Sequence, residues 1–304
     1  MHLNETSMKI TKTKLKQIIK EEIEQLARGR SNISLSSDQA QNVRQTQNRA
    51  QKIIRLLSST DPDNVEQGLT ILDALEDQQL IDTIASHFVF RSDGRITIRG
   101  FKIPNETLEM ILNYFAEKSD HFKNMLAQIE SLNIANVFIT NVDFLRFCTS
   151  LTSLGLWWCS SLQNVDGMKG CTNLTTLSLY KCESLQNVDG LEGCTNLTTL
   201  KLSWGRSLEN VDGLAGCTNL TTLYLYYCKS LQNVDGLEGC TNLMILDLAG
   251  CESLQNVDGL AGCTNLMRLD LTGCESLPPE LQQWFDSDDS GTAHEKFMKA
   301  FNAS

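Results

Sequence analysis

The side chains best suited to recognition chemistry in this chain are aromatic. Of its nine tryptophan and tyrosine residues, seven lie between positions 157 and 227, where one block of sequence recurs with small changes. Tryptophan and tyrosine bring large contact area at low entropic cost and are common at the centres of binding surfaces. The seven residues are Trp157, Trp158, Tyr180, Trp204, Tyr224, Tyr226 and Tyr227.

Charged residues take the equivalent positions in other copies of the block, Lys201 in the third and Asp247 and Asp270 in the last two. With the seven aromatic residues they predict a partner-binding surface. An apolar or planar part of the ligand is expected over the first four copies, and a basic group near the two aspartates. Two structural explanations stay open: the rings stack on one another along a sheet, or the N-terminal part of the chain covers them.

All eleven cysteines lie in the repeated half of the chain, where they form two columns. Side chains of one column in stacked coils are about 4.8 Å apart and parallel, whereas a disulfide needs Cβ atoms about 3.8 Å apart. Zinc is an alternative, but the wide and even spacing of the cysteines, without a histidine among them, does not resemble a zinc site. We therefore predict buried, reduced thiols. One column holds Cys148, Cys171, Cys194, Cys217, Cys240 and Cys263, and the other holds Cys159, Cys182, Cys228, Cys251 and Cys274.

Catalytic chemistry has no comparable support in the sequence. The four histidines, His2, His87, His121 and His294, lie outside the repeats, and none is beside a nucleophile motif. No phosphate-binding loop, nucleophile elbow or metal motif occurs. We therefore predict a protein that is not an enzyme and that has no catalytic residue, metal site or cofactor.

A column of Asp-Gly pairs, such as Asp189-Gly190, recurs in five copies of the block. Stacked aspartates suggest a calcium ladder, but each lacks a second carboxylate beside it in its own copy. We favour a tight turn in which the aspartate caps backbone amides. In such a turn the glycine takes an unusual dihedral angle.

The elements that hold these side chains follow from the repeat. The first cysteine column marks a constant step along the chain, and each cysteine is followed by L-x-x-L-x-L, as at Leu174, Leu177 and Leu179. A period of about 23 residues predicts a solenoid, in which each coil buries its apolar face by stacking on its neighbours. Residues 132–139 fit a capping coil that is one residue shorter than the others.

The pattern L-x-x-L-x-L-x-x-C-x-S-L resembles the signature of leucine-rich repeat proteins, in the variant with cysteine at the usual asparagine position. The resemblance implies an α/β fold, a curved solenoid with short parallel strands on its concave face, and partner binding as its usual role. The second half of each block contains glycines and is too short for a long helix. We therefore expect turns and short 3₁₀ turns there.

Composition divides the chain into four parts. We expect an amphipathic helix and flexible linker over 1–38, a mostly helical capping domain over 39–130, the solenoid with terminal caps over 131–285, and a polar tail over 286–304. The amphipathic helix is expected over 9–28, and in the capping domain we expect a short hairpin over 88–100 and a helix that Asn105 caps. The first coil of a solenoid exposes an apolar end that needs a cap. Phe144 and Phe147 are expected to pack that coil against the helical part.

Charge and hydropathy limit the classes of partner and the location that we expect for this chain. A net charge of −11 and a pI near 4.9 argue against nucleic-acid binding. No apolar run reaches the about 18 residues that a membrane span needs, and no secretory signal is visible. We expect a monomeric scaffold in the cytoplasm. The predicted function is a protein–protein adaptor that binds a protein or peptide partner, and the alternative is a carbohydrate- or small-ligand-binding receptor that uses the same aromatic surface.

Overall fold

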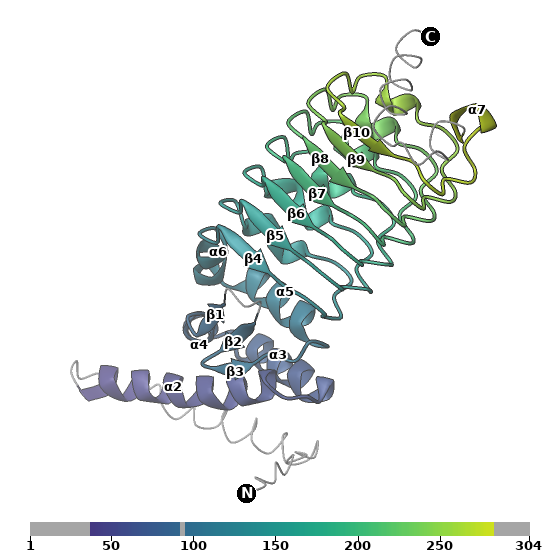
Figure 1. The fold of residues 1–304 in the computed structure, drawn as a ribbon. Coiled ribbons are helices and arrows are strands. Elements are labelled where there is room, and N and C mark those ends of the chain that lie inside the picture. The colour runs from purple at the N-terminus through teal and green to yellow at the C-terminus, as the bar shows by residue number, and fades with distance from the viewer. Residues whose placement is uncertain (1–36, 92–94, 283–304) are drawn as a thin grey trace, which may run out of the picture.

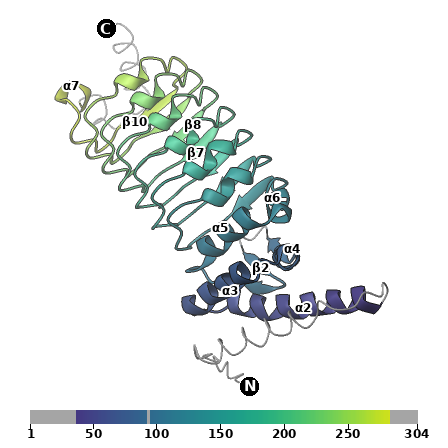
Figure 2. The same cartoon turned by 180° about the vertical axis from the view of Figure 1, so that it is seen from behind.

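The computed structural model describes residues 37–91 and 95–282, which form a helical N-terminal block joined to an elongated solenoid (Figure 1). The amphipathic helix expected at 9–28 and the polar tail expected at 286–304 lie outside the described residues. Seen from behind, the helical block covers one end of the solenoid, and the coils stack in sequence order (Figure 2).

The N-terminal block packs helices around a small antiparallel sheet with the strand order β1-β2-β3. Its core includes the ring of Phe88, which meets Phe115 and Phe122 edge-on at centroid distances of 5.0 and 4.7 Å. Among the described residues, no helix has both the length and the apolar character to cross a bilayer. The elements are α2 (Ser37–Leu57), α3 (Pro62–Leu75), α4 (Gln78–Ala85), β1 (Phe88–Phe90), β2 (Ile96–Ile98), β3 (Phe101–Lys102), α5 (Leu108–Lys118) and α6 (Asp120–Leu126).

Local signals in the sequence account for part of this block. Asp61 caps α3 by accepting a hydrogen bond of 3.1 Å from the Asp63 backbone N–H, and the hairpin predicted over 88–100 forms as β1 and β2. The helix expected to follow Asn105 begins later, at α5. Thr107, and not Asn105, is the N-cap residue of α5, and the Asn105 amide donates to the Asn136 carbonyl of the solenoid at 2.7 Å.

The solenoid carries a seven-stranded parallel sheet with the order β10-β9-β8-β7-β6-β5-β4. Leu154 pairs with Leu177 and Leu177 with Leu200, whereas Leu132 pairs with Leu154, a step that is one residue shorter than the other two. The shorter capping coil predicted from the sequence is therefore confirmed. The strands are β4 (Ser131–Asn133), β5 (Ser153–Gly155), β6 (Thr176–Ser178), β7 (Thr199–Lys201), β8 (Thr222–Tyr224), β9 (Ile245–Asp247) and β10 (Arg268–Asp270), and α7 (Pro279–Gln282) follows them.

Short 3₁₀ helices form the opposite side of the coils, as the glycine-containing half of the block predicted. The proposed mechanism of the Asp-Gly turn was wrong, because Asn187 Oδ1 accepts the Asp189 backbone N–H at 3.3 Å and is the capping group. Gly190 is not among the positive-φ residues, but a Cβ there would overlap the Val165 carbonyl of the preceding coil. Close approach of coils therefore requires glycine. The 3₁₀ helices are η1 (Asp143–Phe147), η2 (Asp166–Gly170), η3 (Asp189–Leu191), η4 (Asp212–Leu214), η5 (Asp235–Leu237) and η6 (Asp258–Leu260).

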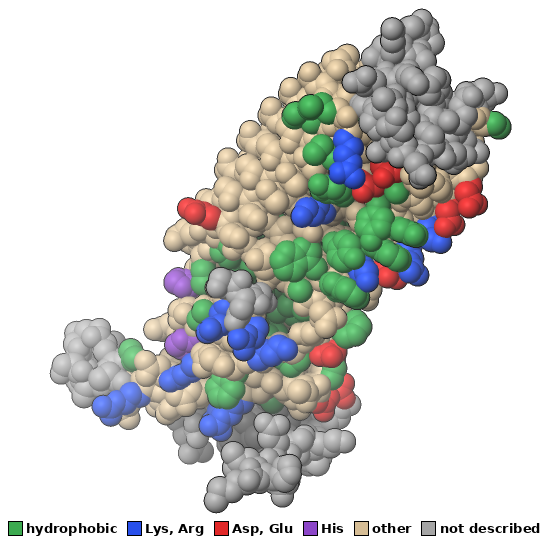
Figure 3. All heavy atoms as spheres, viewed as in Figure 1, with side chains coloured by type: hydrophobic (Ala, Val, Ile, Leu, Met, Phe, Trp, Pro, Cys, Tyr) green, Lys and Arg blue, Asp and Glu red, His purple; other side chains and the backbone are tan. Residues whose placement is uncertain are grey.

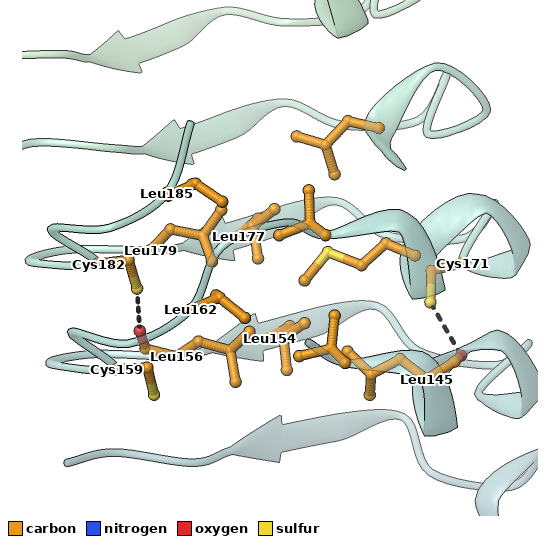
Figure 4. Packing of buried hydrophobic residues seen from close by; sticks show 14 of the residues in the cluster. Leu145, Leu154, Leu156, Cys159, Leu162, Cys171, Leu177, Leu179, Cys182 and Leu185 are labelled. Atoms are coloured by element: carbon orange, nitrogen blue, oxygen red, sulfur yellow. Dashed lines mark hydrogen bonds between the residues drawn. The ribbon is translucent and has the colours of Figure 1, made fainter. Parts of the chain in front are cut away.

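Leucines and cysteines fill the space between the strands and the 3₁₀ helices (Figure 4). All eleven cysteines are buried free thiols, as predicted. Cys171 Sγ donates to the Leu145 carbonyl at 3.4 Å and Cys182 Sγ donates to the Leu156 carbonyl at 3.0 Å, in each case one coil back. A thiol thus packs as a small hydrophobe and also supplies a weak donor between coils. Burial raises the pKa of the Cys171 thiol to about 12.

The helical block joins the first coil through α5. The Glu109 carboxylate accepts hydrogen bonds from the Thr140 backbone N–H at 2.5 Å, from the Thr140 hydroxyl at 2.9 Å and from the Asn141 amide. Phe144 is buried and Phe147 is half-buried, and η1, which carries both rings, contacts α5 and α6. The packing expected of the two phenylalanines is therefore present.

Candidate binding surface

Three positions of the block differ from coil to coil: the residue between the last two leucines of L-x-x-L-x-L and the two residues after the last leucine, which are Lys201, Ser203 and Trp204 in the third coil. The sequence pattern places all three on the strand, and in the structure they gather where the strands end. Each strand has three residues, so only the first variable position, occupied by Lys201 in β7 and Tyr224 in β8, lies on the sheet. The other two variable positions were expected on the strand, but they lie on the turn that follows it. The extended run stops early because the third variable position has a left-handed backbone.

Left-handed geometry at this third position recurs in every coil. The last two coils place glycine there, with φ of +73° at Gly250 and +75° at Gly273. Glycine adopts this conformation freely, whereas an L side chain adopts it at a cost of about 1–2 kcal/mol. Four earlier coils nevertheless carry a large side chain at φ between +60° and +65°: Trp158, Lys181, Trp204 and Tyr227.

Several of the rings hold one another in place. Trp204 stacks on Tyr227 with centroids 4.6 Å apart and planes 9° apart. Tyr226 meets Trp204 edge-on at 5.8 Å, and Trp204 Nε1 donates to the Tyr226 hydroxyl at 2.5 Å. The ring of Tyr227 covers the next coil, where a Cβ on Gly250 would lie 3.3 Å from it. Ring stacking along the solenoid, one of the explanations left open by the sequence, is therefore present in this part of the surface.

Lys181 lies among the rings. Its Nζ is 3.8 Å from the ring centroid of Trp158, 5.7 Å from that of Tyr180 and 5.3 Å from that of Trp204. Separations of up to about 6 Å allow an ammonium group to be attracted by the negative face of a ring. The lysine thus links the ring of the first full coil to the stacked pair of the third and fourth.

Two further cations border the same rings. Arg206 Cζ is 5.3 Å from the ring centroid of Trp204, and Lys201 Nζ is 6.0 Å from that of Tyr224. Figure 3 shows hydrophobic side chains gathered on this face of the solenoid, with basic and acidic side chains beside them. The surface therefore combines aromatic rings with charged groups, and the cations nearest the rings are Lys181, Lys201 and Arg206.

The remaining aromatic residues are partly covered. Trp157 is 40% exposed, and a Cβ on Gly155 would lie 2.5 Å from Asn133 Oδ1 and 2.9 Å from the indole, so glycine in this strand leaves room for both side chains. Tyr180 and Tyr226 interact across the intervening coil, where Ser203 is 4% exposed. Desolvation raises the pKa of the Tyr180 phenol, and its hydrogen bond and charge interaction with Tyr226 raise it further.

Asp247 and Asp270 are neighbours in adjacent strands. One oxygen of each accepts a backbone N–H two residues on, from Ala249 at 3.1 Å and from Thr272 at 3.0 Å. Burial raises the pKa of Asp247, the hydrogen bond from Ala249 opposes this shift, the charge of Asp270 adds to it, and the charge of Arg268 opposes it. Two carboxylates this close favour basic groups beside them, and Arg268, on the same strand as Asp270, is one that the chain itself supplies.

The coil geometry decides the architecture. Parallel strands recur in register from coil to coil, the leucines of L-x-x-L-x-L are buried, and a buried cysteine follows them in each full coil but one, where Gly205 takes its place. The array is a leucine-rich repeat solenoid.

Comparison with solved structures finds other leucine-rich repeat proteins at low identity. Internalin C2 of Listeria monocytogenes is 21% identical, with 56% of this chain and 90% of that chain covered and a TM-score of 0.39. The leucine-rich repeat domain of the type III effector XopL is 16% identical, with 93% and 95% covered and a TM-score of 0.38. The T. pallidum leucine-rich repeat protein is 20% identical, with 51% and 80% covered and a TM-score of 0.27. No family model and no curated protein matches the sequence.

The leucine-rich repeat solenoid also has an open groove of about 1270 Å³ before the strands begin, lined by asparagines and threonines and, in the last coils, by Met244, Leu266 and Met267. The Asn196 amide donates to the Thr172 carbonyl at 2.9 Å, and the Thr198 hydroxyl donates to the Thr175 carbonyl at 3.0 Å. Because equivalent bonds recur along the array, these side chains hold neighbouring coils in register. Over 37–91 and 95–282, no three His, Cys, Asp or Glu residues are grouped to bind a metal ion.

The sequence pattern located the rings of this leucine-rich repeat surface but missed how they are held. It did not predict Lys181 or Arg206 as site residues, although both make cation–π contacts with Trp204. It also missed the left-handed backbone. The signal was present, because Gly250 and Gly273 stand at the repeat position that Trp204 occupies in its own coil.

Proposed function

We propose that this chain is a non-catalytic recognition module that binds a protein or peptide partner through the residues at the strand ends of coils one to four. We call this set the aromatic surface, and Asp247 and Asp270 beside it the acidic pair. The aromatic surface consists of Trp157, Trp158, Tyr180, Lys181, Lys201, Trp204, Arg206, Tyr224, Tyr226 and Tyr227.

One observation carries the proposal: large side chains occupy left-handed positions that glycine fills in the last two coils. Coils built on Gly250 and Gly273 show that the scaffold accepts glycine there. Keeping Trp158, Trp204 and Tyr227 at φ of +60° or above therefore works against stability locally. Residues held in an unfavourable backbone conformation cluster at ligand-binding sites, which supports a binding role for this turn.

The shape of the surface supports a macromolecular partner. The rings lie on exposed turns, with Trp158 53% and Tyr227 38% exposed, and they are fixed by contacts with one another. Small ligands are usually enclosed in a concave pocket, whereas rigid aromatic anchors on an open surface suit a protein or peptide. Eleven free thiols suit a reducing compartment, so we place the module in the cytoplasm.

The test uses glycine substitutions that the scaffold already accepts. Proteins retained from the native cell by the wild-type chain would be compared with those retained by Trp158→Gly/Trp204→Gly/Tyr227→Gly. A control, Val89→Ser/Met244→Ser/Met267→Ser, removes exposed apolar side chains elsewhere, 48%, 41% and 68% exposed. We expect a partner that the wild type and the control retain and the glycine variant loses.

Two other outcomes would contradict the proposal. Equal retention by the glycine variant would mean that the aromatic surface is structural. Saturable binding of a sugar at the same rings, without a stable macromolecular complex, would favour the carbohydrate receptor instead.

A further inference from the structure

The three cations of the aromatic surface contact rings and not carboxylates. Lys181, Lys201 and Arg206 each lie within 6.0 Å of a ring centroid. Within the part of the chain that the structure describes, no carboxylate oxygen lies within 4.0 Å of their nitrogens. Lys229 of the same array shows the contrast, because its Nζ pairs with Glu252 at 2.6 Å.

The charges of these three cations are therefore not neutralised by a carboxylate of the described residues. The negative faces of the rings already attract the chain's own cations, so a cation from a partner would gain little there and would be repelled by three positive charges. An anion would be attracted by the same charges. The chemistry that fits among the rings is therefore a carboxylate beside a planar or apolar group.

The sign of the charge reverses along the solenoid. Lys201, Tyr224, Asp247 and Asp270 occupy one position of successive coils and pair in register. Neighbouring strands are about 4.8 Å apart, so the backbones of Lys201 and Asp247 are about 10 Å apart, with one ring between them. About three residues of an extended chain cover this distance.

We propose that the partner segment is bipolar, which rests on the proposed function and extends it. It places carboxylates over Lys181, Lys201 and Arg206, a planar or apolar side chain over Tyr224, and a basic group at the acidic pair about 10 Å further along the solenoid. The order of charges, and not the net charge of the segment, then determines recognition.

The order can be tested with two peptides of identical composition. Dye-labelled Glu-Glu-Trp-Tyr-Arg-Arg and its scrambled form Glu-Arg-Trp-Tyr-Glu-Arg would be titrated with the full chain by fluorescence anisotropy. We expect the ordered peptide to bind about tenfold more tightly at low salt, and the difference to shrink at about 1 M salt, where screening acts over about 3 Å.

Matched variants assign the effect to the three cations. Lys181→Gln/Lys201→Gln/Arg206→Gln is expected to lose the preference for the ordered peptide. The control Lys118→Gln/Arg146→Gln/Lys169→Gln removes the same charge from exposed positions elsewhere and should keep it. The control side chains are 48%, 46% and 62% exposed.

The inference is overturned by equal affinity for the two peptides, by no binding of the ordered peptide up to millimolar concentration, or by an equal loss in the control. Tighter binding of an acidic oligosaccharide than of the ordered peptide would overturn the assignment to a protein segment. The proposed function fails separately, if the glycine variant of the aromatic surface keeps the cellular partner whatever the peptides do.

Discussion

Single positions in the coil separate what the scaffold requires from what it tolerates. Gly190 is required, because a Cβ there would overlap a carbonyl of the preceding coil. Trp158 is tolerated, because its φ of +61° suits glycine better than any L side chain. Both positions carry glycine in some coils, but for different reasons, and substitutions should distinguish the two.

Replacing Gly190 by alanine should be strongly destabilising. The added Cβ forces neighbouring coils apart, and overpacking of this kind costs about 1–3 kcal/mol or more. Gly193→Ala is the matched control in the same coil, where a Cβ would lie 3.1 Å from the Lys169 carbonyl and a small shift relieves it. Urea unfolding measures both, and equal stability of the two variants would rule out the close-approach argument.

At position 158, a glycine variant should be more stable than an alanine variant, which is the reverse of the usual order of stability. At φ of +61° we expect Trp158→Gly to be more stable than Trp158→Ala by about 1 kcal/mol, because only alanine keeps the left-handed penalty. Urea midpoints of the two variants test this directly. Lys169→Gly against Lys169→Ala, at a position outside the left-handed set, should show the ordinary order. A more stable alanine variant at 158 would mean that the backbone conformation carries no strain.

The buried thiols make stability depend on pH. Burial raises the pKa from 9.0 to about 12 at Cys171 and Cys217 and to about 11 at Cys194. A pKa raised by folding stabilises the fold fully below pH 9, and this stabilisation is lost as the pH rises from 9 through 11 to 12. The urea midpoint should therefore fall between pH 8.5 and 10.5. Cys171→Ala/Cys194→Ala/Cys217→Ala should show a shallower fall, and an equal slope would exclude the thiols as its cause.

At the level of elements, the sequence predicted what repeats and missed what occurs once. The strands and the shorter capping coil followed from the constant step between cysteines, because each coil repeats the same leucine spacing. The predicted start of α5 was wrong, because α5 has Thr107 as its N-cap residue. The Asn105 amide donates a hydrogen bond to the solenoid, and no local sequence pattern contains such a tertiary contact. The repeat also revealed the rings, because they stand at positions where the copies differ from one another. Their turn geometry and the place of Lys181 depend on backbone dihedrals and on contacts between coils, which spacing alone does not determine.

The junction between α5 and the first coil should act as one cooperative contact. Glu109→Ala removes a carboxylate that accepts three hydrogen bonds from Thr140 and Asn141. Since Glu109 is half-buried, we expect a loss of about 1–2 kcal/mol and separate unfolding of block and solenoid. Glu106→Ala, an exposed change one residue before the N-cap of the same helix, should leave a single transition. A single transition in both variants would show that the junction does not depend on the hydrogen bonds of Glu109.

For the whole molecule, the solenoid sets distances between chemical groups through the number of coils. An extra coil can be inserted after Tyr227 as a copy of residues 251–273 with serine in place of Asp270. The insert has the length of one full coil, so the register is kept and no residue of the aromatic surface changes. The separation of Lys201 from Asp247 then rises from about 10 to about 15 Å.

The affinity of the ordered peptide should fall about tenfold in this variant, because the segment can no longer reach both charges at once. The same coil inserted after Gly273 adds equal length beyond the acidic pair and should leave the affinity unchanged. Coil stabilities are nearly additive in a solenoid, so both insertions should unfold at similar urea concentrations. Equal affinity in both would mean that the two ends of the surface bind independently, and the spacing of the coils would then have no part in recognition.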